Sequence, residues 1–215
     1  MSLEQIIVQV NPDSLPSGSD LTAVNAARKS FGKRSEWLNE EDLWTWRNTP
    51  THDTPFNHSF VSFEVKAPIF VARHLVKTEY TIMSEYSRRY ITDDVEFYQH
   101  DYREASEDKK QGSGGVHKDN AHWQRQAQIA NERQLELYDS MITKGIAPEQ
   151  ARGQLPLDLM TSWTWSGTLG AMAKMCRERL GSDAQKETRH VAGEVYKVLK
   201  EHYPVSAKCL VEGVL

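Results

Sequence analysis

The stretch HDTPFNHSFVSFEVKAPIFVAR, residues 52–73, predicts a turn, a strand and the start of a helix in immediate succession. Residues 59–67 alternate imperfectly between apolar and polar side chains, as in a strand with one buried face. Pro68 suits the first turn of a helix, because the N–H that it lacks would have no intrahelical partner there. We expect this helix to continue over residues 68–79, and residues 47–58 to form a loop.

The chain on either side predicts strands early and helices late. Extended segments are expected at residues 6–10 and 85–98, and a polar surface loop at 99–118. Helices are expected over 20–30 with Asp20 as cap, from Asn39 through NEEDLWTW, over 120–144 before Gly145, briefly from Pro148, over 168–180, and from a Ser182–Gln185 capping box to about residue 202. We therefore predict one α/β (α+β type) domain over residues 1–215. Its central, mainly antiparallel sheet is expected to be flanked by helices, with the long helices in the C-terminal half.

The composition disfavours several classes of protein. The formal net charge is -4, so no overall electrostatic attraction to nucleic acid is expected. No apolar run approaches the roughly 18 residues that span a membrane, and the start, MSLEQIIVQV, lacks the pattern of a signal peptide. Cys176 and Cys209 belong to no CxxC pair, which disfavours a zinc finger or a disulfide framework. We expect a cytoplasmic protein without membrane or nucleic-acid partners.

Charged side chains gather after residue 67. If the helix reaches residue 79, Arg73 and Lys77 share one face because they are four residues apart. If the next segment is extended, Glu85, Ser87 and Arg89 point the same way. A carboxylate, a hydroxyl and a guanidinium in one row suit a phosphorylated sugar, since arginine forks to phosphate and serine donates to it. The alternative is a salt-bridged surface strand beside a cationic helix face.

Two other candidate sites are weak on spacing alone. His52 and His58 lie six residues apart with Asp53 between them. A metal site needs a third ligand and a firmer spacing, so we expect hydrogen-bonded loop residues and no metal. Cys176 has no histidine close by in the sequence and lies among apolar residues, so we expect a core cysteine and not a nucleophile.

Several blocks of the chain resemble, in the same order, the flavin-dependent thymidylate synthases. The 52–73 stretch is similar to that family's HxTPFxH turn and KAPIFVARQ-like helix, and SEYSRRY (84–90) is similar to its NExSxRY motif. The likeness continues in AARKSF (26–31), in ARGQLPL (151–157) and in RERLGSDAQKETRHVA (177–192), which resembles R-x-x-x-HAQxEIR. Together these blocks cover most of the chain.

The resemblance implies a nucleotide site and a cofactor site. The residues that match the nucleotide side are Glu85, Ser87, Arg88, Arg89, Arg152, His74 and Arg179. The first four are expected around the sugar and phosphate, and Arg152 is expected to reach the phosphate from a neighbouring subunit. His74 replaces a glutamine that serves the nucleotide, and Arg179 is expected to hold the pyrimidine ring. The residues that match the flavin and folate side are Ser30, His52 and Thr54.

The same resemblance implies a reaction. Family members are homotetramers with shared sites, in which FAD, methylene-tetrahydrofolate and NADPH together convert dUMP to dTMP. C5 of a pyrimidine is a poor nucleophile until charge can build on the ring, and a guanidinium fixed at that edge, Arg179 here, would stabilise the charge. FAD would supply the redox step, and the protein would supply orientation and electrostatics.

Departures from the family pattern lie on the flavin and base side. The family's Arg-His-Arg triplet is replaced by Lys77-Thr78-Glu79, its HAQ by Asp183-Ala184-Gln185, and two asparagines by Thr168 and Lys174. We still expect the triplet, Thr168 and Lys174 to contact the cofactor, and Asp183 to face the base. Because the phosphate side is kept, nucleotide binding is a firmer expectation than the flavin geometry or the identity of the base.

These departures leave alternatives open. A carboxylate such as Asp183 or Glu79 would favour the exocyclic amine of cytosine, so the enzyme would then methylate or hydroxymethylate dCMP. Hydroxymethylation of dUMP is another possibility, and so is a non-catalytic nucleotide-binding protein or a soluble protein of unrelated function. Asp183 itself has a plainer alternative, as an acidic residue favoured by the dipole at a helix N-terminus.

Overall fold

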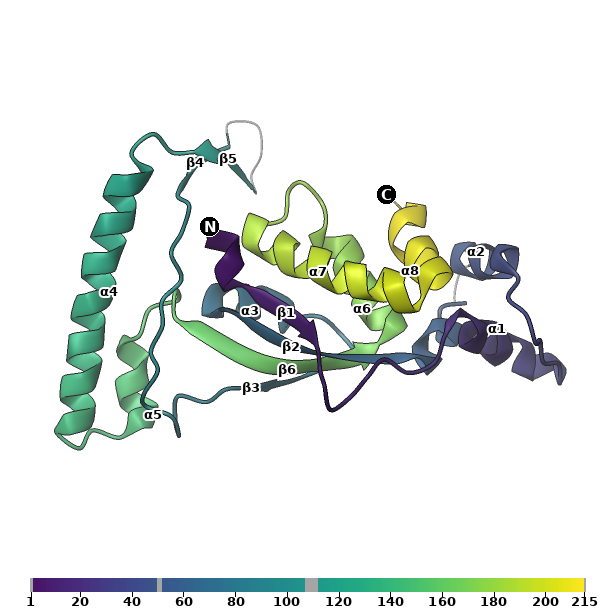
Figure 1. Ribbon diagram of the computed structural model, residues 1–215, viewed down its shortest axis with the longest axis horizontal. Coiled ribbons are helices and arrows are strands. Elements are labelled where there is room, and N and C mark those ends of the chain that lie inside the picture. Colours follow the sequence, from purple (N-terminus) through teal and green to yellow (C-terminus); the bar gives the residue numbers. More distant parts are fainter. Residues whose placement is uncertain (1, 50–51, 107–111, 215) are drawn as a thin grey trace.

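A four-stranded antiparallel sheet forms the centre of the computed structural model, which describes residues 2–49, 52–106 and 112–214 (Figure 1). The strands lie in the order β1 (Ile7–Val10), β2 (Phe60–Pro68), β6 (Met160–Thr168) and β3 (Thr81–Glu85), and each neighbouring pair is antiparallel. The predicted fold class is therefore confirmed. The sequence analysis assigned no element to β6, although it pairs with β2 over the whole length of both strands.

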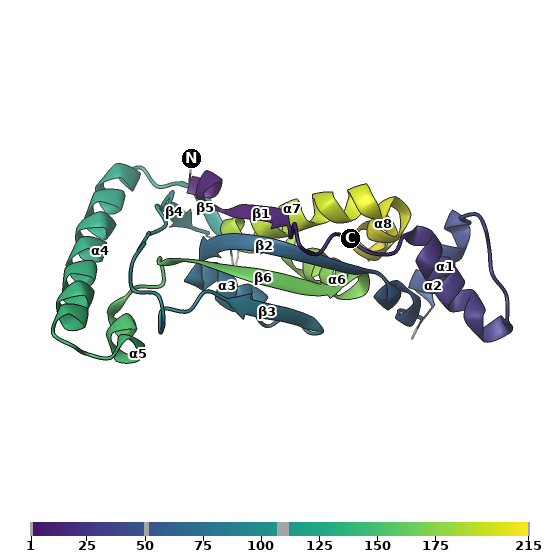
Figure 2. The same cartoon turned by 60° about the horizontal axis from the view of Figure 1, so that its bottom comes forward.

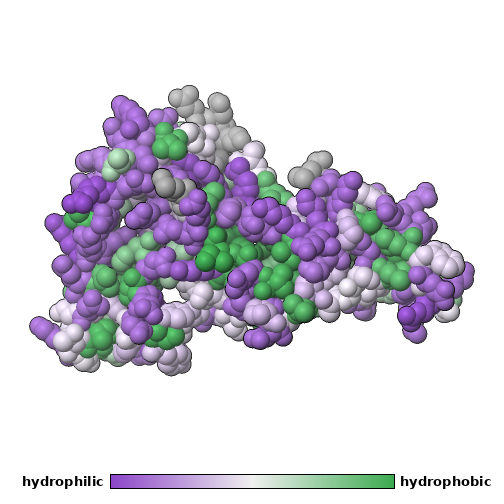
Figure 3. Space-filling view, viewed as in Figure 1, coloured by the Kyte–Doolittle hydropathy of each residue, from purple (hydrophilic) through white to green (hydrophobic). Residues whose placement is uncertain are grey.

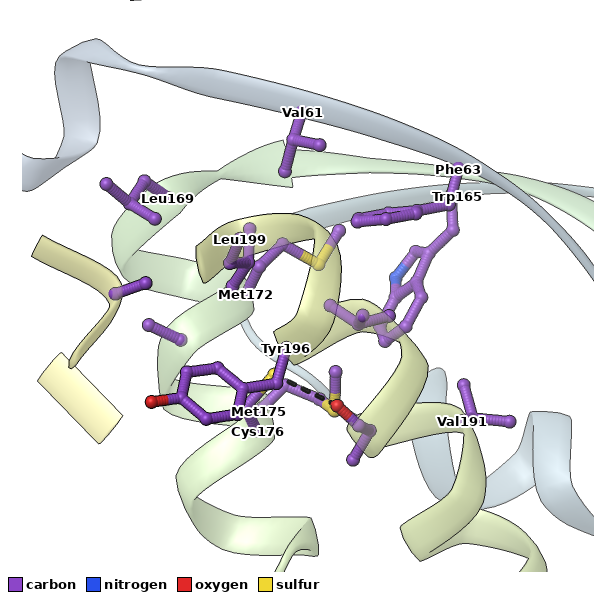
Figure 4. Packing of buried hydrophobic residues seen from close by; sticks show 14 of the residues in the cluster. Val61, Phe63, Trp165, Leu169, Met172, Met175, Cys176, Val191, Tyr196 and Leu199 are labelled. Carbon is purple, nitrogen blue, oxygen red and sulfur yellow. Dashed lines mark hydrogen bonds between the residues drawn. The ribbon is translucent and has the colours of Figure 1, made fainter. Parts of the chain in front are cut away.

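One face of the sheet is covered by helices and forms the core. Val61 and Phe63 of β2 and Trp163 and Trp165 of β6 are almost fully buried. Figure 4 shows Val61, Phe63 and Trp165 pointing from the sheet toward the helical layer that carries Met172. Burying alternate residues of a strand on one face is what an antiparallel sheet with one covered face requires.

The helices fall into three groups (Figures 1 and 2). Those that cover the sheet are α3 (Ile69–Leu75), α6 (Leu169–Arg179), α7 (Lys186–His202) and α8 (Pro204–Val211). At one end of the molecule lie α1 (Asp20–Arg28) and α2 (Glu40–Asn48), and at the other end lie α4 (Asn120–Thr143) and α5 (Pro148–Ala151). Short 3-10 helices occupy Ser2–Gln5, Lys29–Phe31, Thr54–His58, Arg152–Gln154 and Glu212–Val214. The helix expected over 120–144 is thus confirmed almost to the residue.

The predicted role of Asp20 as the cap of the first helix is wrong. Ser19 is the N-cap of α1, and its N–H donates to the hydroxyl of Thr22 at 2.9 Å. The Asp20 carboxylate instead accepts hydrogen bonds from the N–H groups of Val205 (2.9 Å) and Ser206 (2.8 Å). Asp20 therefore satisfies the free amides at the start of α8, a role that only a long-range contact can assign.

Two predictions after Pro68 are also wrong. The helix α3 ends at Leu75 and not near residue 79, so Lys77 lies in the following turn and does not share a helix face with Arg73. Residues 85–98 are not extended throughout, because the strand ends at Glu85 and the N–H of Tyr90 donates to the carbonyl of Ser87 in a turn. The chain must reverse twice here to place β3 beside β6.

The C-terminal half contains two further corrections. The expected loop 99–118 contains a small hairpin of β4 (Arg103–Ala105) and β5 (Ser113–Val116), and residues 107–111 lie outside the described residues. The last long helix begins at Lys186, with Gln185 as its N-cap, so the Ser182–Gln185 capping box is not formed. The Arg189 guanidinium donates to the carbonyls of Ser182 (3.0 Å) and Ala184 (2.7 Å) and holds this segment as a turn before the helix.

Both cysteines are free and buried, as expected for core residues. The Cys176 thiol lies 3.5 Å from the carbonyl oxygen of Ala192, and burial raises the pKa of this thiol. A nucleophilic role is disfavoured, since the thiolate is the reactive form. None of the helices in the described part of the chain combines the length and apolar character needed to cross a bilayer.

Candidate functional site

A cavity of about 520 Å³, here called the Arg179 cavity, lies where the ends of α3, α6 and α7 meet the β4–β5 hairpin. It is lined by His74, Lys77, Arg103, Arg179, Asp183 and Thr188, among other residues. Four of these residues, from three separate segments, were singled out in the sequence analysis: His74, Lys77, Arg179 and Asp183. The fold therefore brings His74, Arg179 and Asp183, which were expected on the nucleotide side, together with Lys77, which was expected to contact the cofactor.

The two residues that best define the chemistry of this cavity are His74 and Arg179. His74 Nδ1 lies 3.0 Å from the Thr188 hydroxyl. Burial, and then the charges of Arg179 and Lys77, lower the pKa of His74 from its ordinary value of 6.5, so the imidazole is neutral at pH 7. The Nε of Arg179 is buried without a hydrogen-bond partner in the described structure. An unpaired buried donor is costly, which favours a ligand that accepts from it.

The wall of the Arg179 cavity is held by a buried ion pair that the sequence analysis missed. The Arg103 guanidinium donates to both Glu187 carboxylate oxygens, at 2.8 and 2.9 Å, and its Nε donates to the Ser113 hydroxyl at 2.6 Å. Burial, the largest single cause, raises the pKa of Glu187. The hydrogen bonds and charge of Arg103, together with a backbone hydrogen bond and one from Gln185, outweigh burial and lower the pKa. Arg103 lies in a segment predicted to be a loop, so its spacing carried no signal.

A second, smaller cavity of about 200 Å³, the β3-end cavity, collects residues expected around the sugar and phosphate. Its lining includes Glu85, Ser87, Arg88 and Arg152. Glu85 accepts a hydrogen bond from the Thr161 hydroxyl at 2.8 Å. A single chain thus brings Arg152, which the resemblance assigns to a neighbouring subunit, beside the residues that it is expected to complement.

The row of Glu85, Ser87 and Arg89 is wrong as geometry, because the chain turns at Ser87. Arg89 lies outside the β3-end cavity lining and sits 3.8 Å from the Glu149 carboxylate. Arg88 is buried, and its guanidinium donates to the carbonyls of Asp93 and Asp94, the second at 2.7 Å. Both Nη atoms of Arg88 therefore close the turn, and its Nε is buried without a hydrogen-bond partner in the described structure. Arg152, which lines the cavity, and Arg89 have more of their guanidinium donors left for phosphate.

A third cavity of about 580 Å³, the α2–α6 cavity, lies between the C-terminal end of α2, the 3-10 helix Thr54–His58 and α6. Its lining includes His52 and Lys174, two of the residues expected on the cofactor side. The Lys174 ammonium donates to the Glu79 carboxylate at 2.7 Å, and this hydrogen bond lowers the pKa of Glu79. Two departures from the family pattern therefore pair with each other.

The remaining cofactor candidates lie in four different segments of the chain. Thr168 caps α6 by accepting from the N–H of Ala171, and its hydroxyl donates to Asn57 Oδ1 at 2.6 Å. Thr54 begins the 3-10 helix and is exposed, while Thr78 lies in the turn after α3. Ser30 is exposed just after α1 and donates to a backbone carbonyl. Thr54, Thr78 and Ser30 all lie outside the lining of the α2–α6 cavity in the described structure.

Known proteins are similar to this chain over most of its length. The family model described as "Thymidylate synthase complementing protein" matches residues 14–205. A flavin-dependent thymidylate synthase of Thermus thermophilus is 32% identical over 200 residues, covering 92% of this chain and 74% of the relative. That of Wolbachia pipientis wMel is 31% identical over 204 residues, covering 92% and 72%.

Solved structures include the UMP/dUMP methylase PolB from Streptomyces cacaoi bound with 5-Br dUMP. It superposes with a TM-score of 0.84 at 27% identity, covering 96% of this chain and 95% of that one. The same enzyme bound with 5-Br UMP superposes with a TM-score of 0.82 at 25% identity, covering 96% and 94%.

Proposed function

Because the chain belongs to the thymidylate synthase complementing protein family, whose curated relatives are flavin-dependent thymidylate synthases, we propose that it converts dUMP to dTMP. At the coarser level it is an enzyme that modifies C5 of a pyrimidine nucleotide. Its cofactor is FAD, and methylene-tetrahydrofolate and NADPH are its co-substrates. The observation that carries the proposal is the Arg179 cavity, where a buried guanidinium N–H without a partner lies beside a neutral histidine.

Arg179 and His74 have different roles at the base. Arg179 donates to the pyrimidine edge and stabilises the negative charge that builds on the ring as C5 attacks. His74, held by Thr188 and kept neutral, orients the nucleotide without adding a competing positive charge. Arg152, in the lining of the β3-end cavity, and Arg89, outside that lining, are assigned to the monophosphate, because arginine forks match phosphate oxygens.

The residues present on the cofactor side fit a phosphate-bearing cofactor. The α2–α6 cavity has room for such a group, and its lining includes His52 and the ammonium of Lys174. These two residues, with Ser30, Thr54, Thr168 and the Lys77-Thr78-Glu79 segment, are assigned to the FAD and folate side. When bound, FAD supplies the redox step of the one-carbon transfer.

The second candidate substrate is dCMP. Asp183 lies before α7 and lines the Arg179 cavity, which supports a hydrogen bond from an exocyclic amine to its carboxylate. Methyl and hydroxymethyl transfer are both open for this base. The structural neighbour, which is described as a UMP/dUMP methylase, supports the uracil base over cytosine.

The assembly proposed is a homotetramer of chains that each form one domain over residues 1–215, with sites shared between subunits. Four large aromatic side chains, Phe31, Trp37, Tyr80 and Tyr90, are more than 70% exposed and would gain from burial in such contacts. Figure 3 also shows apolar residues, in green, on an otherwise hydrophilic surface.

The test is turnover of dUMP and dCMP side by side, with FAD, methylene-tetrahydrofolate and NADPH. The expected result is a protein that binds FAD and produces dTMP from dUMP. If the protein turned over dCMP and not dUMP, dCMP would replace dUMP as the proposed substrate. A colourless protein whose melting temperature does not respond to FAD would overturn the enzymatic function, because a ligand specific to the folded state raises its stability.

A further inference from the structure

The α2–α6 cavity contains two cations to which neither the family resemblance nor the proposed function gives a role. Arg47, near the C-terminal end of α2, and Arg177, in the last turn of α6, both line it. Arg177 opens one of the blocks that resemble the family, but no nucleotide or cofactor contact was assigned to it or to Arg47. Together with His52 and Lys174, they place four basic side chains in this lining.

The two guanidinium groups have little to neutralise them. Arg47 Nε is buried without a hydrogen-bond partner, and Arg177 Nη1 donates to the Leu210 carbonyl at 3.2 Å. Neither arginine forms an ion pair with any described carboxylate. Burial first, and then the charge of Arg47, lower the pKa of Arg177, which indicates that the two cations lie close together.

The other charges around this cavity do not offset the pair. The Lys174 ammonium forms an ion pair with the Glu79 carboxylate, at 2.7 Å. Asp53 is the one carboxylate among the described lining residues, and it forms no ion pair in the described structure. Two like charges held together in a partly buried site repel each other, so their placement is unfavourable until an anion arrives.

We infer that the α2–α6 cavity is an oxyanion site, in which Arg47 and Arg177 bind a phosphate or carboxylate group of a cofactor or co-substrate. The inference rests on the proposed function for the source of that anion. Guanidinium forks match both kinds of oxyanion, and a charge-assisted hydrogen bond is about twice as strong as a neutral one. The nucleotide monophosphate is not the occupant, because Arg152 and Arg179, the residues assigned to the nucleotide, line the other two cavities.

Two ligands of the proposed reaction have such oxyanion groups. One is the phosphates of a dinucleotide such as FAD, and the other is the glutamate carboxylates of the folate. If the aliphatic parts of the two arginines only packed against apolar surface, this would explain their burial, since long side chains cover such surface. It would not explain a buried N–H without an acceptor, which costs free energy unless a ligand supplies one.

The experiment uses Arg47→Met and Arg177→Met in the full-length protein, with Arg125→Met as the matched control. Arg125 is exposed on α4 and lines none of the three cavities. Dissociation constants are measured calorimetrically for FAD, for tetrahydrofolate with one and with three glutamates, and for dUMP. Circular dichroism confirms folding, and Arg47→Gln and Arg177→Gln, which also remove the charge, replace any methionine variant that does not fold.

The expected result is a loss of affinity of about tenfold or more in both arginine variants and none in Arg125→Met, with dUMP binding unchanged. A loss confined to FAD assigns the site to dinucleotide phosphates. If the wild type binds tetrahydrofolate with three glutamates more tightly than with one, and the variants lose this difference, the site is assigned to the folate carboxylates. Unchanged affinity for both ligands, or the same loss in Arg125→Met, overturns the inference.

Failure of the proposed function has a different signature. If the wild type binds neither FAD nor folate, the same variants are titrated with inorganic pyrophosphate. Pyrophosphate binding that Arg47→Met and Arg177→Met remove, and Arg125→Met keeps, would preserve the oxyanion site without the proposed reaction. Absence of pyrophosphate binding to the wild type in that case overturns the site as well.

Discussion

The Arg179 cavity and the α2–α6 cavity both have a lysine or arginine paired with a glutamate at their walls, but the two pairs differ in burial. The side chains of Arg103 and Glu187 are 13% and 0% exposed, whereas those of Lys174 and Glu79 are 40% and 65% exposed. A buried pair with matched hydrogen bonds fixes its neighbours, while an exposed pair is screened by water and salt. The base end of the molecule is therefore pre-organised, and the cofactor end leaves its cations available to a ligand.

The largest effect is expected from Glu187→Gln, which leaves the Arg103 charge buried and uncompensated. Breaking one partner of a buried pair typically costs about 3–5 kcal/mol of unfolding free energy, to be measured by urea denaturation at pH 7. The folded-state pKa of Glu187 lies below its ordinary value of 4.5. Its contribution is therefore present above pH 4.5 and is lost as the pH falls through the folded pKa.

A double change sharpens this prediction. Replacing Arg103 and Glu187 together by Met removes both charges, so the double variant should be more stable than Glu187→Gln alone. A double variant that is less stable than the single one would show that the hydrogen bonds of Arg103 to the Ser113 hydroxyl and the Asp101 carbonyl, and not the ion pair, hold the cavity wall.

Arg179→Ala tests the chemistry of the same cavity. Because Arg179 faces charge that develops only in the transition state, its loss should lower kcat by roughly 10²-fold or more, with little change in the dissociation constant of dUMP. Steady-state kinetics and calorimetry together separate the two effects. An equal fall in affinity and turnover would instead make Arg179 a ground-state binding residue.

A smaller effect is expected from Arg89→Ala and Arg152→Ala. Each removes a charge-assisted contact to phosphate worth about 1.5–3 kcal/mol, so nucleotide affinity should fall about tenfold or more while FAD binding stays intact. Mixing the two variants after subunit exchange should restore part of the activity if Arg152 serves a neighbouring site. Arg152 and Glu85 line the same cavity of one chain, so no recovery would indicate a site complete within each subunit.

The smallest effect is expected from Glu79→Gln. Glu79 pairs with Lys174 at the surface, so the melting temperature should not change measurably in differential scanning calorimetry. This variant is the exposed counterpart of Glu187→Gln. A drop in stability comparable to that of Glu187→Gln would remove the contrast between the two ends of the molecule.

The sequence by itself determined the family, the fold class and the helices α1, α2, α4, α5 and α6. These are properties of local patterns, since periodicity and turn residues act over a few positions and ordered motif blocks survive divergence. The core role of Cys176 was readable for the same reason, from its apolar neighbours.

Only the tertiary structure decided which of those residues meet. Asp20 caps α8 across 185 positions of sequence, Arg103 binds Glu187 across 84, and Glu79 binds Lys174 across 95. The end of β3 at Glu85 also follows from a long-range demand, the pairing of β3 with β6. Such contacts have no local period to read, because their free energy comes from packing and pairing of segments that the sequence keeps apart.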